Sequence, residues 1–177
     1  YEGKPLDSRQ TLYWKAMVWD EAGEASPWSE TGRWTMGLLE PSDWTARWIG
    51  NREDAYPDST LTTPAPYFRK TFRINKPVKQ AKAYICGLGF YEMYLNGERV
   101  GDQGLPPAVT NFDRRSLKKM LYFFDDQSNQ RVLYNTFDVT SLVQKAENTV
   151  GVLLGNGWYN QRDRTVEGCM WYDTPRL

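Results

Sequence analysis

The stretch Tyr91-Glu92-Met93-Tyr94-Leu95-Asn96-Gly97-Glu98-Arg99-Val100-Gly101 decides the fold. Every second residue before the turn, namely Tyr91, Met93 and Leu95, falls on one face of an extended chain, which is the period of a half-buried β-strand. The Asn96-Gly97 pair favours a type I′ turn, because both central residues of that turn need a positive φ angle. Residues 91–101 therefore predict a β-hairpin.

Short runs rich in aromatic and β-branched residues continue this pattern on both sides of the hairpin, separated by the Gly, Pro, Asn and Asp residues typical of turns. Long helical periodicity is not evident. We predict an all-β protein, with one helical turn at 139–143 and an ambiguous, helix-like stretch at 116–124. The predicted strands cover residues 12–19, 33–36, 68–74, 81–86, 132–137 and 150–154, and a further strand is suggested at 170–172.

The composition divides the chain into three parts. Residues 1–40 hold two strands, too few for a stable sheet, so we expect the end of a β-sandwich. Residues 41–66 are rich in Pro, Asp, Thr and Ser and are expected to form a linker. Residues 67–177 are expected to form a second sandwich that is incomplete at position 177. The open strand edges of two incomplete sandwiches predict self-association.

Charge and residue content exclude several classes of function. Twenty-two basic residues balance 22 acidic ones, so we expect no nucleic-acid partner. No apolar run reaches 18 residues, so we expect no membrane partner. The chain has no histidine, which excludes Ser-His-Asp catalysis and histidine-ligated zinc within it. Its two cysteines, Cys86 and Cys169, are too few for a four-thiolate site, and we expect both to be free thiols.

Several motifs resemble the jelly-roll sugar-binding domains of glycoside hydrolases, including β-galactosidases and β-glucuronidases. They are Tyr94-Leu95-Asn96-Gly97, Val100-Gly101-Asp102 and Phe137-Asp138-Val139-Thr140. Further motifs narrow the resemblance to the N-terminal domain of glycoside hydrolase family 78, the bacterial α-L-rhamnosidases. These are Leu154-Gly155-Asn156-Gly157-Trp158-Tyr159, together with Asp43-Trp44, Trp48-Ile49 and Ala65-Pro66 upstream.

The first 40 residues fit the same family. Tyr13-Trp14-Lys15, Val18-Trp19-Asp20 and Trp28-Ser29 resemble the last strands of the fibronectin-type, immunoglobulin-like domain that precedes the jelly roll. The resemblance covers nearly the whole chain. Residues 114–131 depart from it, because this segment is longer than the family pattern leads us to expect.

The resemblance implies a non-catalytic accessory fragment. Family members cleave terminal α-L-rhamnose with inversion, using carboxylates of a separate (α/α)₆ barrel that this chain lacks. The expected partner is therefore that missing catalytic domain. The sequence leaves both the periplasm and the cytoplasm as possible compartments. An intact enzyme with an unrecognised carboxylate site is an alternative, but the densest acidic pairs all fall in predicted turns. These pairs are Asp20-Glu21, Glu53-Asp54 and Asp125-Asp126.

A carbohydrate-binding module is a second alternative, because jelly rolls often carry sugar sites. Trp158 and Tyr159 would form a stacking platform for a rhamnose-containing carbohydrate, and Asn156, Arg162 and Asp163 would bond its hydroxyls. Aromatic residues bordered by glycines also commonly fill the end of a sandwich or an interdomain seam. A sugar-binding domain of a β-galactosidase-like or β-glucuronidase-like enzyme is a third alternative.

We expect no cofactor, with calcium left open. Some related sugar-binding modules use calcium, which takes several oxygen ligands. Asn96 and Asp102 are the candidate donors near the hairpin. No loop with the spaced oxygen ligands of a calcium site accompanies them. The β-turn alone explains why an asparagine stands at position 96.

Overall fold

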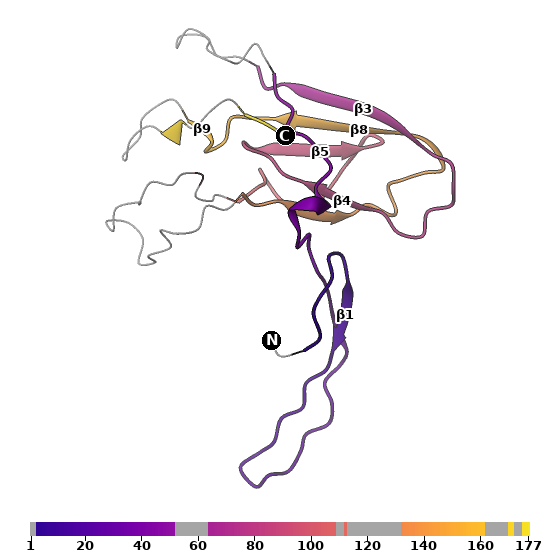
Figure 1. The fold of residues 1–177 in the computed structure, drawn as a ribbon, viewed down its shortest axis with the longest axis vertical. Helices are drawn as coiled ribbons and strands as arrows, with labels where there is room; N and C mark the ends of the chain where they lie inside the picture. Colours follow the sequence, from indigo (N-terminus) through magenta and orange to yellow (C-terminus); the bar gives the residue numbers. More distant parts are fainter. Residues whose placement is uncertain (1–2, 52–63, 109–111, 113–131, 162–169, 172–174) are drawn as a thin grey trace. The chain divides into compact units, whose positions relative to one another are not determined.

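The computed structural model of the chain describes residues 3–51, 64–108, 112, 132–161, 170–171 and 175–177 (Figure 1). Within these residues the secondary structure consists of strands and one short 3₁₀ helix, so the all-β prediction is confirmed. The chain separates into two compact units, Tyr1–Arg47 and Trp48–Leu177. The three-part division into 1–40, 41–66 and 67–177 remains a prediction. No described helix is long and apolar enough to cross a membrane.

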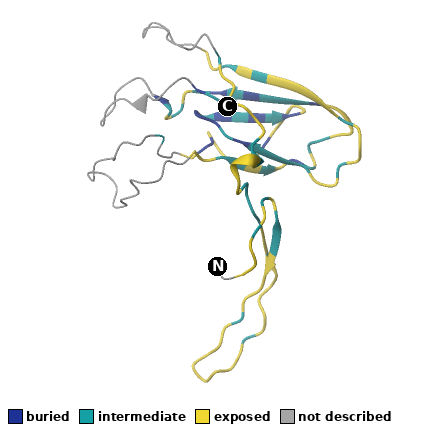
Figure 2. Cartoon of the chain, viewed as in Figure 1, coloured by how far each residue is buried: buried dark blue, intermediate teal, exposed yellow. Residues whose placement is uncertain are grey.

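The first unit is built on one hairpin. Strand β1 (Thr11–Trp14) pairs antiparallel with β2 (Gly32–Thr35), with Trp14 opposite Gly32. This confirms strands in the predicted regions 12–19 and 33–36, although the first ends at Trp14. Beyond β1, serine hydroxyls replace part of the main-chain ladder, since the amide of Ala16 donates to Oγ of Ser29 at 2.9 Å. None of the described residues in this unit is buried (Figure 2).

The far turn of this hairpin is organised by Asp20. Its Oδ1 accepts hydrogen bonds from the amides of Ala22 at 2.9 Å and Glu24 at 2.8 Å. Gly23 adopts a φ of 80°, a conformation that side chains disfavour. The predicted turn is confirmed, and the carboxylate of Asp20 has a local structural role in it.

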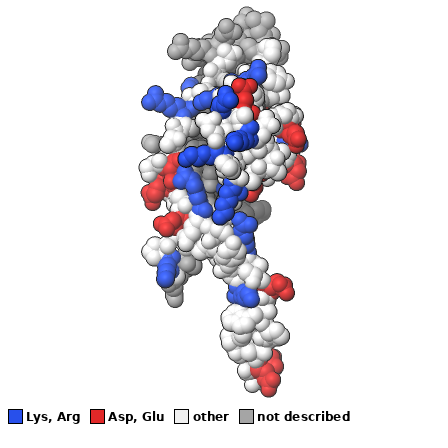
Figure 3. All heavy atoms as spheres, turned by 90° about the vertical axis from the view of Figure 1, so that its right-hand side faces the viewer, with Lys and Arg blue, Asp and Glu red and all other residues white. Residues whose placement is uncertain are grey.

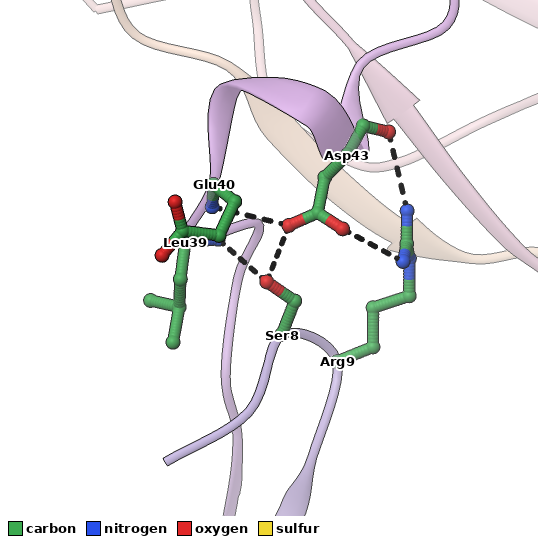
Figure 4. A network of polar contacts seen from close by, with 5 residues as sticks. All are labelled: Ser8, Arg9, Leu39, Glu40 and Asp43. Carbon is green, nitrogen blue, oxygen red and sulfur yellow. Dashed lines mark hydrogen bonds and ion pairs between the residues drawn. The ribbon is translucent and has the colours of Figure 1, made fainter. Parts of the chain in front are cut away.

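A short 3₁₀ helix, η1 (Pro41–Asp43), is tied to the start of the chain through Asp43 (Figure 4). The Asp43 carboxylate accepts hydrogen bonds from the hydroxyl of Ser8 and from the amide of Glu40, the latter at 3.1 Å. Arg9 lies 3.2 Å from Oδ1 of Asp43. The Ser8 hydroxyl oxygen in turn accepts a 2.8 Å hydrogen bond from the amide of Leu39.

The second unit contains the main sheet, whose strands follow the order β3-β8-β5-β6 and pair antiparallel (Figure 1). Its members are β3 (Tyr67–Ile74), β8 (Ala146–Leu154), β5 (Tyr91–Leu95) and β6 (Glu98–Arg99). The predicted strands at 68–74 and 150–154 are confirmed. Strand β8 begins four residues before the predicted start, because it pairs with the whole length of β3.

The predicted hairpin forms one edge of this sheet. Strands β5 and β6 pair antiparallel, and the two turn residues between them have positive φ angles, 54° at Asn96 and 89° at Gly97. Tyr91, Met93 and Leu95 are exposed by only 2%, 9% and 2%. The hairpin, its turn and its buried face are therefore confirmed.

A second layer, formed by β4 (Lys82–Ile85) and β7 (Asn135–Asp138), lies against the buried face of the main sheet. The predicted helical turn follows β7, where the amide of Val143 donates to the carbonyl of Val139 at 3.2 Å. The core lies between the two layers and shows as dark blue in Figure 2. Its buried members are Ile85, Tyr91, Met93, Leu95, Val100, Val139, Val152 and Leu154.

One further strand pair lies near the end of the chain. Strand β9 (Asn160–Gln161) pairs antiparallel with β10 (Met170–Trp171). The predicted strand at 170–172 is confirmed at its first two residues, whereas β9 was not predicted. The helix-like stretch at 116–124 lies outside the described residues.

Candidate functional site

Several loops of the second unit meet at the end of the main sheet where β5 begins and β8 ends. Main-chain hydrogen bonds join them: the amide of Tyr91 donates to the carbonyl of Pro106 at 2.9 Å, and the amide of Gly155 donates to that of Phe90 at 2.7 Å. An isolated bridge joins Leu88 to Arg176. We call this region the loop end.

Two glycines allow the loops to approach this closely. A Cβ atom added to Gly89, which has a φ of 133°, would overlap the carbonyl oxygen of Gly155. A Cβ added to Gly157, which has a φ of 53°, would lie 2.7 Å from the amide nitrogen of Phe90. Both positions therefore require glycine for its backbone conformation and for its size.

The loop end carries a small, open apolar pocket of about 10 Å³, the space of roughly one water molecule. The Trp158 side chain is 42% exposed. The Tyr159 ring packs edge-on against Phe112, with ring centroids 5.2 Å apart and an angle of 87° between planes. The lining residues are Gly89, Phe90, Pro107, Ala108, Phe112, Trp158 and Tyr159.

The structure brings together two of the five predicted sugar-site residues, Trp158 and Tyr159, as neighbours in this lining. Asn156 serves the local turn, because its Oδ1 accepts a 3.2 Å hydrogen bond from Nδ2 of Asn160. Arg162 and Asp163 lie outside the described residues. That the five residues form one site thus remains a prediction.

Sequence reasoning missed the other walls of the pocket. Pro107 and Phe112 come from a segment more than 40 residues before Trp158 in the chain. No pattern in the sequence indicated which loop this segment would meet. Asn160, only 6% exposed, was missed as well.

Of the two candidate calcium donors, Asn96 lies in the turn at the other end of β5, whereas Asp102 follows β6, which runs back toward the start of β5. Asn96 fixes the hairpin turn, because its Oδ1 accepts from the amide of Thr149 at 2.8 Å and its Nδ2 donates to the carbonyl of Leu142 at 2.8 Å. Among the described residues no three His, Cys, Asp or Glu side chains gather as metal ligands. The expectation of no cofactor, with calcium left open through Asn96 and Asp102, stays a prediction.

Buried protonated groups surround the start of β5. The half-buried thiol of Cys86 is free, and burial raises its pKa to about 11. Burial also raises the pKa of Tyr91, whose hydroxyl donates to Oδ1 of Asn135 at 2.8 Å. Both groups therefore keep their protons at neutral pH, and neither is an activated nucleophile.

The predicted acidic pairs supply no cleft within the described part of the chain. Asp20 stabilises the hairpin turn of the first unit, as described above. Glu53-Asp54 and Asp125-Asp126 lie outside the described residues. Glu92, on the main sheet, accepts a 2.9 Å hydrogen bond from the Tyr94 hydroxyl, and this bond is the largest cause of the raised pKa of Tyr94.

Two family models match the chain. The model of the "Alpha-L-rhamnosidase N-terminal domain" matches residues 76–123 and 124–176. The model of the "Rha78A-like, N-terminal immunoglobulin domain" matches residues 1–40.

Curated relatives and solved structures agree with these matches. An α-L-rhamnosidase of Formosa agariphila is 38% identical over 91% of this chain and 17% of its own length. An α-L-rhamnosidase of an Alteromonas species is 35% identical over 92% of this chain and 16% of its own length. The solved α-L-rhamnosidase of Dictyoglomus thermophilum is 34% identical, with a TM-score of 0.75 over 99% of this chain and 18% of its own. The chain thus spans about a sixth of the length of the curated relatives.

Proposed function

Because the chain belongs to the α-L-rhamnosidase N-terminal domain family, we propose that it is a non-catalytic accessory region of an α-L-rhamnosidase. In this proposal a catalytic barrel elsewhere in a longer enzyme hydrolyses terminal α-L-rhamnose, and the second β unit docks against it through the loop end and orients it. The relatives are about six times longer than the matched region, which leaves room for such a barrel.

The observation that carries the proposal is the apolar character of the loop end. The described residues that line its pocket are aromatic, proline, alanine and glycine residues, and among them only Tyr159 carries an ionisable group. Trp158 and Leu105 expose 42% and 58% of their side chains there. Exposed apolar residues around a closely packed loop cluster favour contact with another protein surface over acid/base chemistry.

A hydrolysis assay tests the non-catalytic part. Inverting hydrolysis needs a carboxylic acid and a carboxylate roughly 6.5–9.5 Å apart in one cleft. We expect the chain to release no aryl alcohol from an aryl α-L-rhamnoside above the rate in buffer. Release that increases with protein concentration would refute this part.

A chimera tests the docking part. The chain replaces the matching region of the Dictyoglomus thermophilum relative, and the melting temperature of the chimera is measured with and without Trp158→Ala. We expect this substitution to lower the melting temperature, because a tryptophan at the centre of an interface commonly contributes about 2 kcal/mol or more. The matched control is Trp28→Ala, since Trp28 is 60% exposed on the first unit. Equal effects of the two substitutions would contradict docking through the loop end.

A second candidate function is rhamnose binding at the same place, favoured by the exposed ring of Trp158. In this candidate Trp158 and Tyr159 stack on the sugar and Asn156, Arg162 and Asp163 bond its hydroxyls. Titration calorimetry with L-rhamnose, on the chain and on its Trp158→Ala variant, separates the two candidates. Heat that disappears in the variant supports sugar binding, and no heat in either protein rejects it.

A further inference from the structure

The outer face of the main sheet, on the side away from the core, carries a row of four residues that crosses all four strands. Arg69 of β3 lies opposite Gly151 of β8, which lies opposite Tyr94 of β5, which lies opposite Arg99 of β6. Alternation along β5 and β8 places these residues opposite the buried ones. Tyr67, 79% exposed, lies two positions before Arg69 on the same face.

Gly151 leaves a gap in this row of side chains, although no neighbouring atom would exclude a larger residue there. A Cβ atom added there would meet only the carbonyl oxygen of Phe68, at 3.9 Å, and the φ angle of Gly151 is not positive. Glycine weakens the interior of a strand, and it often marks a place where a ligand approaches the backbone closely. The gap separates Arg69 from Tyr94 by two strand spacings, about 10 Å.

The arginine side chains around the gap differ in whether an acidic side chain lies next to them. Glu92 accepts from the Tyr94 hydroxyl at 2.9 Å and lies 3.7 Å from Arg99, so these three side chains form one group. Arg73 lies opposite Glu147 in the sheet register, whereas Arg69 lies opposite Gly151, which has no side chain. Arg69 therefore has no acidic cross-strand neighbour.

Other cations lie on β3 and in the loops at its far end. Figure 3 shows Lys and Arg side chains gathered over the second unit at the end where β3 ends and β8 begins. Such a cluster of cations attracts anions to this part of the unit, and a guanidinium binds carboxylate or sulfate groups with two parallel hydrogen bonds. The exposed cations of β3 and the neighbouring loops are Arg69, Lys70, Arg73, Lys76, Lys79 and Lys145.

We propose that this row is a binding site for a negatively charged saccharide. The Arg69 guanidinium holds the carboxylate or sulfate of the sugar, and the ring lies over Gly151 against the tyrosine rings. Arg99 and Glu92 provide a donor and an acceptor for hydroxyl groups. A neutral sugar would leave Arg69 unpaired, so the charge favours an acidic one. This site is separate from the loop end, and its test is independent of the docking proposal.

Calorimetry at low salt tests the site with four probes: trigalacturonate, a sulfated dextran oligosaccharide, maltotriose and an oligothymidylate. We expect binding of trigalacturonate or the sulfated oligosaccharide, and the one that binds identifies the acidic group. Maltotriose should bind at least about tenfold more weakly. No binding of either acidic saccharide, or equal binding of the oligothymidylate, overturns the proposal.

Two variants and one control test whether the saccharide binds at these residues. Gly151→Val fills the gap with a side chain that favours strands, so binding should fall at least about tenfold while the melting temperature stays equal or rises. Arg69→Gln should weaken binding similarly, and it keeps the test valid if Gly151→Val does not fold. Lys15→Gln removes one charge from the first unit and is the control. Equal losses in Arg69→Gln and Lys15→Gln, or unchanged binding in Arg69→Gln, overturn the proposal.

Discussion

Nδ2 of Asn96 donates a 2.9 Å hydrogen bond to Oδ1 of Asn148, and this bond joins the β5–β6 turn to the start of β8. Asn148 is only 1% exposed. Its Oδ1 also accepts from the amide of Gln144, and its Nδ2 donates to the carbonyls of Gln144 and Ala146. One buried amide therefore organises two connections of the main sheet.

Asn148→Ala should lower the free energy of unfolding by about 1–3 kcal/mol, because it leaves buried main-chain groups without partners. Denaturant unfolding of the second unit measures this. Gln144→Ala is the control, since its exposed side chain makes one bond to the carbonyl of Glu147, and its effect should stay within about 0.5 kcal/mol. Equal losses in the two variants would contradict a special role for Asn148.

Gly157→Ala should cost more stability than Gly97→Ala. Both glycines have positive φ angles, but a Cβ at Gly97 would meet nothing within 4 Å, whereas one at Gly157 would lie 2.7 Å from the Phe90 amide. Backbone strain alone should cost about 1 kcal/mol at Gly97, and the steric clash at Gly157 should add at least about 1 kcal/mol more. Denaturant midpoints of the two variants test this. A smaller loss at Gly157 would refute the close packing of the loop end.

The thiol of Cys86 should react slowly with iodoacetamide at neutral pH, because burial raises its pKa to about 11. Burial disfavours ionisation of the thiol in the folded state. The protonated thiol therefore contributes its full stability at pH values below the unfolded pKa of about 9, and this contribution is lost as the pH rises from about 9 to about 11. Mass spectrometry of the peptide containing residue 86 measures the labelling. Labelling as fast as in denatured protein would contradict the prediction, and Cys86→Ala should remove this pH-dependent part.

Ser8→Ala should raise the pKa of Asp43 more than Arg9→Gln does. The Ser8 hydroxyl is the largest cause of the lowered pKa of Asp43, and the charge of Arg9 contributes less. Because the pKa of Asp43 is lowered, the ionised carboxylate stabilises the folded first unit at pH values above the ordinary pKa of 3.8. This stabilisation is lost as the pH falls through the lowered pKa. An NMR titration of the Asp43 carboxyl carbon measures both variants. A larger shift in Arg9→Gln would reverse the assigned order.

Local patterns predicted the strands well where one face is buried. The alternation of Tyr91, Met93 and Leu95 and the Asn96-Gly97 turn are read from adjacent residues, because period and turn geometry are local properties of the chain. The strand predicted for residues 12–19 ended early at Trp14, since serine side chains beyond it take over bonds of the ladder. Strand β9 escaped prediction, because two residues are too short for a period to be visible.

The candidate site was predicted only in part. Trp158 and Tyr159 stood out as aromatic residues beside glycines, but their contact with Phe112 and Pro107 joins loops distant in the sequence. The sheet register likewise places Arg69, Gly151, Tyr94 and Arg99 in one row, although they come from four separate strands.

The sequence by itself determined the all-β class, the central hairpin and the family, because these depend on local alternation, turn residues and short motifs. Only the tertiary structure decided which loops enclose the apolar pocket and which charged side chains share the outer face. Contacts between residues far apart in the chain depend on how strands pair and layers pack, and no local pattern encodes that pairing.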